Sequence, residues 1–198
     1  NIDLAGVQSA PQASTTFQIG ANLDSAATAA TTFNTPITLF NSVGSQILLN
    51  AQFTKVAGSN SWTYSLTPSD GTVTSGGSGT VTFDSSGQLS TINGALTDQT
   101  IVIDYTAANP PAAAQTLTWD IVDTSGATNG KLTGFAAQSN NNSLVQDGFT
   151  TGTLVGLTVN SEGIIGGLFN NGQTDNLFQV VMADFLAPSG LTRQIGRA

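Results

Sequence analysis

One four-residue pattern occurs four times along the chain and restricts the folds that it can adopt. Each copy has Asn or Asp first, Ser or Thr second, any residue third and Gly fourth. An Asx residue that opens a type I turn, followed by a left-handed Gly, joins two antiparallel strands through a bulged hairpin. The pattern therefore predicts structural turns that start at Asn41, Asp84, Asp123 and Asn160 and end at Gly44, Gly87, Gly126 and Gly163. Both an internal duplication and independent use of good turn chemistry would give this repetition.

Residues 144–191 carry further turn signals between short apolar runs, at Asp147-Gly148, Asn171-Gly172 and Ser189-Gly190. Gly adopts positive φ without a Cβ clash, and Asx side chains bond the backbone that follows them. Val155, Leu157 and Val159 alternate with small or polar residues, which predicts a strand with one buried face. The stretch is predicted to be a β-meander. Its last strand, 177–185, is nearly continuous in apolar residues and is expected to be buried on both faces.

Alternation with a period of two predicts further strands between residues 37 and 121. Four aromatic residues fall on the apolar phase of these strands: Trp62, Tyr64, Tyr105 and Trp119. Each such ring removes about 150–250 Å² from water when buried. We therefore expect all four in the core, whereas a carbohydrate-binding surface would expose them.

The predicted fold class is all-β, with an antiparallel β-barrel or sandwich domain and part of a second, small β-domain. Residues 1–16 show no period and are expected to form an extended segment that belongs to an inner β-domain. Residues 17–140 are predicted to form an outer, barrel-like domain, and residues 141–198 the C-terminal part of the inner one. The boundary is placed where a stretch rich in Gly, Asn and Ser ends.

Composition excludes several classes of function. The chain has no Cys and no His, so disulfides, the usual zinc ligands and Ser-His-Asp or Cys-His catalysis are excluded. Its 4 Lys and Arg are scattered and stand against 12 Asp and Glu, a net charge of −8, so neither nucleic acid nor membrane is expected as a partner. Charged residues make up 8% of the chain, against about 25% in ordinary soluble domains. Such neutral polar surfaces are common in exported bacterial proteins.

An enzyme built from this sequence would depend on carboxylates, and their spacing argues against one. Asp98 and Asp104 on one strand would be about 20 Å apart, too far for the roughly 5–9 Å of a glycosidase pair. No calcium loop of the D-x-[DN]-x-[DN]-G type occurs. Asp147 and Asp175 are expected to form turns. We predict no catalytic, cofactor-binding or metal-binding residues. The sequence does not exclude a catalytic pair of carboxylates that are distant in the chain.

Two series of short motifs resemble the bacterial flagellar hook protein family. The first runs from Asn22-Leu23-Asp24 through 37–44 and Phe53-Thr54-Lys55 to Trp62, with Asn41 where the family usually has Asp. The second comprises 146–148, 152–154, 160–163, 171–173, Ala183-Asp184-Phe185 and Gly190-Leu191, and distal rod proteins share it. Each motif is weak alone, but their order extends over residues 16–196.

This resemblance implies a structural subunit of the flagellar hook, a curved, self-assembling tube outside the cell that couples the motor and rod to the filament and transmits torque. Its partners would be copies of itself and other flagellar axial proteins, and it would need no cofactor. The terminal helical regions of the family are absent here, and the chain begins with Asn1 instead of Met, so we expect a fragment that is monomeric alone. The alternatives are an exported adhesin or carbohydrate-binding β-domain, and the distal rod protein.

Overall fold

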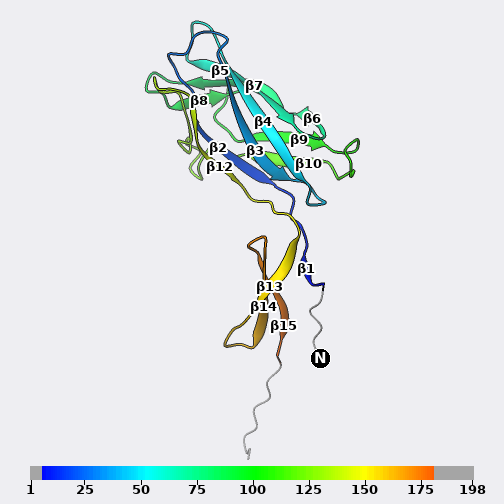
Figure 1. Ribbon diagram of the computed structural model, residues 1–198. Coiled ribbons are helices and arrows are strands. Elements are labelled where there is room, and N and C mark those ends of the chain that lie inside the picture. The colour runs from blue at the N-terminus through cyan, green and yellow to red at the C-terminus, as the bar shows by residue number, and fades with distance from the viewer. Residues whose placement is uncertain (1–5, 181–198) are drawn as a thin grey trace, which may run out of the picture. The chain divides into compact units, whose positions relative to one another are not determined.

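The computed structural model describes residues 6–180, which form strands, turns and loops without a helix (Figure 1). The chain divides into two compact units. The larger is Ala10–Thr151, and the smaller combines Asn1–Ser9 with Gly152–Ala198. The predicted all-β class, with one larger and one smaller β-unit, is confirmed.

The first sheet of the larger unit is antiparallel and has the strand order β3-β4-β5-β7-β8. Its strands are β3 (Thr32–Phe40), β4 (Gln46–Lys55), β5 (Ser61–Pro68), β7 (Ser78–Phe83) and β8 (Leu89–Ile92). The register runs unbroken along β3 and β4, from the pair Thr32 and Thr54 to the pair Phe40 and Gln46. This long hairpin agrees with the period-two alternation of its sequence.

The second sheet of the larger unit has the order β11-β2-β10-β9-β6, and β12 also pairs with β2. Its strands are β2 (Thr16–Asn22), β6 (Thr72–Ser75), β9 (Gln99–Asp104), β10 (Gln115–Trp119), β11 (Leu132–Thr133) and β12 (Asn140–Gln146). Strand β2 pairs with β10 near its start and with β11 near its end, both in parallel. Strand β12 pairs with β2 in the antiparallel direction. Apart from these two short parallel pairs, the ladders of the larger unit are antiparallel, as predicted.

One hydrophobic core contains the inward-facing residues of both sheets. Trp119 is central to its aromatic part: its ring stacks on Phe17 at 5.9 Å between centroids and meets the edges of Phe53 and Tyr64 at 6.3 Å and 5.3 Å. The predicted burial of Trp62, Tyr64, Tyr105 and Trp119 is confirmed, since each is at most 2% exposed.

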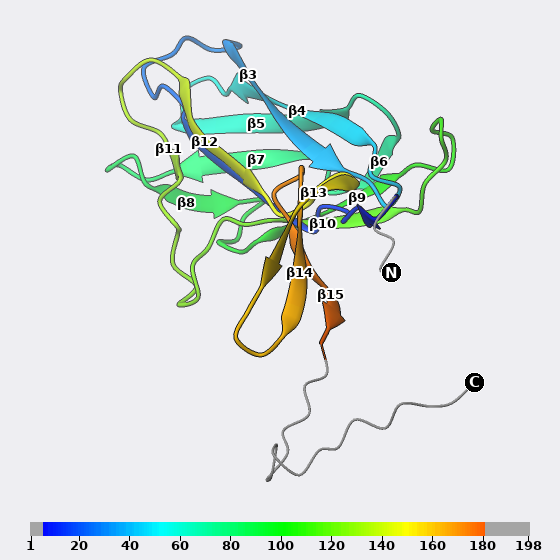
Figure 2. The same cartoon turned by 60° about the horizontal axis from the view of Figure 1, so that its bottom comes forward.

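The smaller unit contains one four-stranded sheet with the order β1-β13-β14-β15, and Figure 2 shows its last three strands side by side. The strands are β1 (Gln8–Ser9), β13 (Gly152–Val159), β14 (Ile164–Phe169) and β15 (Thr174–Gln179). The prediction of a buried apolar face on β13 is wrong, because Val155, Leu157 and Val159 are 61%, 47% and 66% exposed. Within the described residues this unit has a single sheet, so no second layer covers these side chains.

The last strand also differs from its prediction. Strand β15 is mostly exposed, with Phe178 at 43%, so it is not buried on both faces. Residues 181–185 of the predicted strand lie outside the described part of the chain, as does the predicted turn at Ser189-Gly190.

The unit boundaries lie at Ser9/Ala10 and Thr151/Gly152, not at 16/17 and 140/141 as predicted. The reason is that residues 10–16 and 141–151 form backbone hydrogen bonds within the larger unit. Strand β12 joins the larger unit through its ladder with β2, and Gln12 exchanges two backbone hydrogen bonds of 2.9 Å with Phe149. The stretch 126–143, rich in Gly, Asn and Ser, therefore lies inside the larger unit and marks no domain boundary.

Candidate functional site

The four repeated turns share one hydrogen-bond pattern. In each, the Gly N–H donates to the carbonyl oxygen of the Asx residue at 2.9–3.1 Å, and the Gly φ lies between +75° and +81°. The Asx Oδ1 also accepts from the backbone N–H groups two and four residues later; around Asn41 these are Val43 at 3.1 Å and Ser45 at 2.9 Å. Asp84, Asp123 and Asn160 make the same pair of bonds. One side-chain oxygen thus holds both arms of each turn.

Serine hydroxyls add charge-assisted bonds in the two aspartate turns. The hydroxyl of Ser86 donates to Asp84 at 2.7 Å, and that of Ser125 donates to Asp123 at 2.6 Å. These bonds are the main reason that the pKa of each aspartate lies below its ordinary value. Both carboxylates are therefore committed to their own turns.

The turn at Asn171-Gly172 follows the same chemistry in the smaller unit. Gly172 has φ +82°, and its N–H donates to the Phe169 carbonyl at 3.0 Å. The Asn171 Oδ1 accepts from the N–H of Gln173 at 3.1 Å, while its Nδ2 donates to the Ser9 hydroxyl at 2.9 Å. This residue therefore closes the β14–β15 hairpin and also fixes strand β1 within the same unit.

Asp147 and Gly148 do not form the predicted strand reversal. The Asp147 carboxylate accepts from the backbone N–H of Thr15 at 2.7 Å and of Thr16 at 3.0 Å, and from the Thr15 hydroxyl. Gly148 has no room for a side chain, because a Cβ would lie 2.6 Å from the Ser14 backbone nitrogen. The pair therefore joins the end of β12 to the start of β2. The prediction for Asp175 is also wrong, because it lies within strand β15.

Asn22 is a structural residue that the sequence reasoning missed. Its side chain is 7% exposed and lies at the end of β2. Its Oδ1 accepts from the Phe135 N–H at 2.9 Å and the Thr133 hydroxyl at 3.0 Å, and its Nδ2 donates to the Ala137 carbonyl at 2.8 Å. Its position in the Asn-Leu-Asp motif was noted, but its partners lie more than 110 residues away, where local patterns give no signal.

No arrangement in the described residues suggests metal or acid–base chemistry. They contain no cluster of three or more acidic residues suited to a metal ion. Asp98 lies before β9 and accepts from the N–H groups of Ile121 and Val122 at 2.8 Å and 3.0 Å, so its carboxylate has a structural role. Between residues 6 and 180 no helix is long and apolar enough to cross a membrane.

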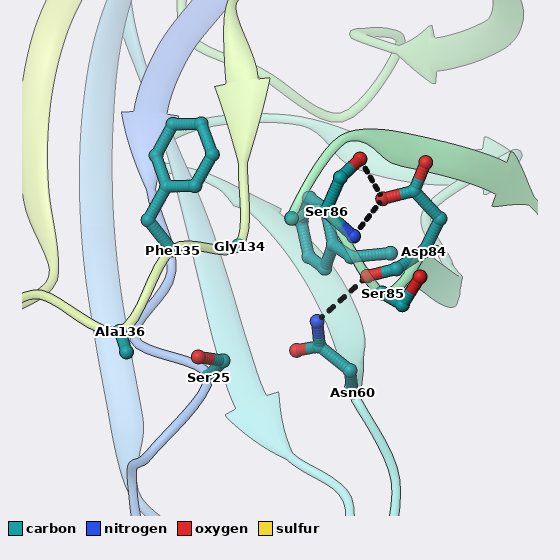
Figure 3. Close-up of a pocket in the computed structure, with 10 residues that line it drawn as sticks. Ser25, Asn60, Asp84, Ser85, Ser86, Gly134, Phe135 and Ala136 are labelled. Carbon is teal, nitrogen blue, oxygen red and sulfur yellow. Dashed lines mark hydrogen bonds between the residues drawn. The ribbon is translucent and has the colours of Figure 1, made fainter.

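A hollow of about 330 Å³ lies beside the 84–87 turn, between this turn and residues 134–136 (Figure 3). Phe135 contributes a ring that is 44% exposed. Asn60 donates from Nδ2 to the Asp84 carbonyl at 3.4 Å, while its Oδ1 points toward Ser25 in Figure 3. The walls also include Phe83 and Asp84, and the remaining lining residues are small.

Comparison with known proteins gives consistent matches. Residues 8–149 match the model of the flagellar basal body protein FlaE D2 domain. The chain is 27% identical over 203 residues to the flagellar hook protein FlgE of Treponema pallidum, an alignment that covers 89% of this chain and 44% of that protein. It is 26% identical over 121 residues to FlgE of Borreliella burgdorferi, covering 58% of this chain and 27% of that protein.

Among solved structures, the fold is similar to that of the Helicobacter pylori flagellar hook protein FlgE2. The TM-score is 0.50 at 15% identity, and the match covers 82% of this chain and 34% of that one. The chain spans less than half the length of the curated relatives that it matches.

Proposed function

The chain belongs to the family of the flagellar basal body protein FlaE D2 domain, and from this membership we propose that it is the outer β-domain, with part of an adjoining domain, of a structural subunit of the bacterial flagellar hook. The observation that carries the proposal is the match over residues 8–149, which includes nearly the whole larger unit. In the complete protein the subunit would assemble with its own copies and with other axial proteins into the tube that joins rod and filament outside the cell.

The proposed mechanism is mechanical, with no catalytic step. A unit with two sheets around one aromatic core, closed by side-chain-bonded turns, is a stiff body. Neighbouring stiff bodies can slide as a curved tube rotates if their contacts exchange at low cost. A surface with few charges and many Thr, Asn and Gln residues allows this, because no strong ion pairs have to break.

The alternatives have less support. A carbohydrate-binding domain would present its aromatic rings, but both Trp and both Tyr residues are in the core. The named relatives are hook proteins, which favours the hook over the distal rod.

Immunogold labelling of the source bacterium tests the proposal. Antibodies raised against residues 10–151 are expected to label the short segment between cell body and flagellar filament, and deletion of the gene should remove both this segment and swimming. Label spread over the cell surface, with swimming intact in the deletion strain, would instead support an adhesin.

A further inference from the structure

The first sheet of the larger unit, formed by β3, β4, β5, β7 and β8 (Figure 1), has an outer side without charged residues. Burial alternates along its strands, and the outward-facing residues are the even-numbered ones of β3, β4 and β7, the odd-numbered ones of β5, and Thr91 of β8. We call this surface the neutral face. All five strands lie in the described part of the chain, and the one charged residue in them, Lys55, faces inward.

Hydroxyl and amide side chains make up most of the neutral face. The register aligns them in rows across the strands, one of which is Asn34, Gln52, Ser65 and Ser78. Within this row the Gln52 Nε2 donates to the Asn34 Oδ1 at 3.1 Å. Such side chains carry both donors and acceptors, so a second surface of the same composition can pair with them. Leu48, which is 46% exposed, adds one large apolar side chain to the face.

Carboxylates of the larger unit lie away from the neutral face. On the second sheet, Asp104 ends β9 and Asp120 directly follows β10, and both continue the outward-facing rows of their strands. Asp70 and Asp84 lie beyond the ends of β5 and β7. The net charge of −8 is therefore unevenly distributed, and an acidic body that approaches the neutral face meets no like charge on it.

This charge distribution favours one kind of partner. A basic protein would be attracted to the carboxylates, so it would bind elsewhere on the unit. A carbohydrate would need exposed aromatic rings, and the exposed large apolar side chain of this face is a leucine. A second copy of the chain carries the same net charge of −8. It is repelled wherever carboxylates would face each other, and it can come closest at the neutral face.

The size of the neutral face suits a contact that is repeated in a polymer. Five strands about 4.8 Å apart, with 4 to 10 residues at about 3.3 Å each, give a face of roughly 600 Å². Each partner in a standard stable interface buries about 800 Å². One contact through this face would therefore be weak between two isolated chains, but many such contacts would hold a tube together.

We propose that the neutral face is the surface through which the larger unit contacts a second copy of the chain in the assembled tube. The proposal rests on the hook function proposed above, and it adds which side of the unit makes the contact. A charge placed on this face should harm assembly, whereas the same charge on the second sheet should not.

The test compares Thr63→Glu with Thr116→Glu in the full-length chain. Thr63 is exposed on β5, the middle strand of the first sheet, and Thr116 is exposed on β10, the middle strand in the order of the second. Both changes add one negative charge, so only its position differs. Sedimentation and electron microscopy measure the critical concentration for tube formation. Thr63→Glu should raise it about tenfold, because an unpaired carboxylate is buried in the contact, and Thr116→Glu should change it less than about twofold.

Gln52→Glu provides a second variant, in case Thr63→Glu does not fold, because it changes the charge of the face with almost no change in shape. It should also raise the critical concentration about tenfold. The melting temperature of each variant shows whether the chain is folded before assembly is measured.

Tubes of both neutral-face variants that form at the wild-type concentration would overturn the inference and leave the hook function standing. An equal rise for Thr116→Glu would also overturn it, because the effect would then follow from net charge alone. If these variants form normal tubes but bacteria that make them lack filaments, the face binds another axial protein instead of a second copy. Wild-type chains that form no tubes would overturn both the proposed function and the inference.

Discussion

At the scale of single residues, the turn glycines combine two separate constraints. Gly87 and Gly126 end nearly identical Asp turns, with φ +78° and +81°. A Cβ on Gly126 would meet nothing within 4 Å, whereas one on Gly87 would lie 2.6 Å from the Phe135 ring and 3.1 Å from the Gly134 carbonyl. The same sequence pattern therefore places one glycine in open space and the other against a neighbouring segment.

This difference gives a matched pair of variants. Gly126→Ala should lower the free energy of unfolding by about 1 kcal/mol, the cost of a left-handed backbone for alanine. Gly87→Ala carries the same cost and also displaces Phe135, so we expect a further loss of about 1–2 kcal/mol. Urea denaturation followed by tryptophan fluorescence measures both, since Trp62 and Trp119 lie in this unit. Equal losses would show that the contact with Phe135 adds nothing.

Tyr105 predicts how the larger unit responds to alkaline pH. Burial, with a contribution from Asp70, raises the pKa of Tyr105 from 10.0 to about 12. Below pH 10 the phenol is protonated in both the folded and the unfolded chain. Between about pH 10 and 12 the unfolded chain releases the proton and the folded chain keeps it, so stability falls over this range.

Tyr105→Phe should remove this tyrosine's part of the alkaline decline. At neutral pH the variant should lose about 1–3 kcal/mol, because the buried Gln115 Oε1 loses the hydroxyl that donates to it at 2.9 Å. Urea titrations at pH 8 and pH 11 measure both effects. An equally steep decline in the variant would assign the pH dependence to another group.

At the scale of elements, Asp147 holds the start of β2 and the end of β12 together. Burial raises the pKa of its carboxyl, but hydrogen bonds from Thr15 and Thr16 outweigh this effect, and the pKa lies below its usual value. The stability that it contributes is present above the ordinary aspartate pKa and is lost as pH falls through the lowered one.

We expect Asp147→Ala to lower the free energy of unfolding by about 1–3 kcal/mol at pH 7 and by less near pH 3. Hydrogen exchange should show the earliest loss of protection in β12, because its ladder with β2 starts beside this carboxylate. Asn142→Ala, at an exposed position of the same strand, is the control for a surface change there. A loss that is the same at both pH values would contradict a role for the carboxylate charge.

In the smaller unit, a buried and an exposed apolar residue are expected to differ in how much they stabilise the fold. Phe169 on β14 is 2% exposed, whereas Leu157 on β13 is 47% exposed. Phe169→Ala should lower the free energy of unfolding by about 3–5 kcal/mol. Leu157→Ala should change it by no more than about 0.5 kcal/mol. Because neither Trp lies in this unit, amide hydrogen exchange of β13 and β14 is the measurement. A large effect of Leu157→Ala would show that its face is covered in solution.

Local patterns in the sequence predicted those features that depend on neighbours in the chain. The four Asx turns and the core position of Trp119 follow from spacing within a few residues. The misread features depend on distant partners: Asp147 bonds residues 15 and 16, and β12 pairs with β2 across more than 110 residues. In the sequence, Lys55 is a polar residue at the end of an alternating strand. The structure shows that its side chain is the last of the inward-facing row on β4.

At the scale of the whole molecule, burial differs between the two units. The larger unit buries both Trp and both Tyr residues between two sheets, whereas the smaller exposes apolar side chains on β13 and β15. Exposed apolar surface of this kind marks contact sites in proteins that assemble. This asymmetry agrees with a subunit whose larger unit is a stiff body, and it does not require ligand binding or catalysis.

Electron microscopy of the purified full-length chain under polymerising conditions tests the central claim most directly. A hook subunit should form curved tubes of uniform diameter, with the larger unit on the outer surface. A chain that stays monomeric at every concentration and salt condition tried, or that forms only irregular aggregates, would contradict the assignment to the hook.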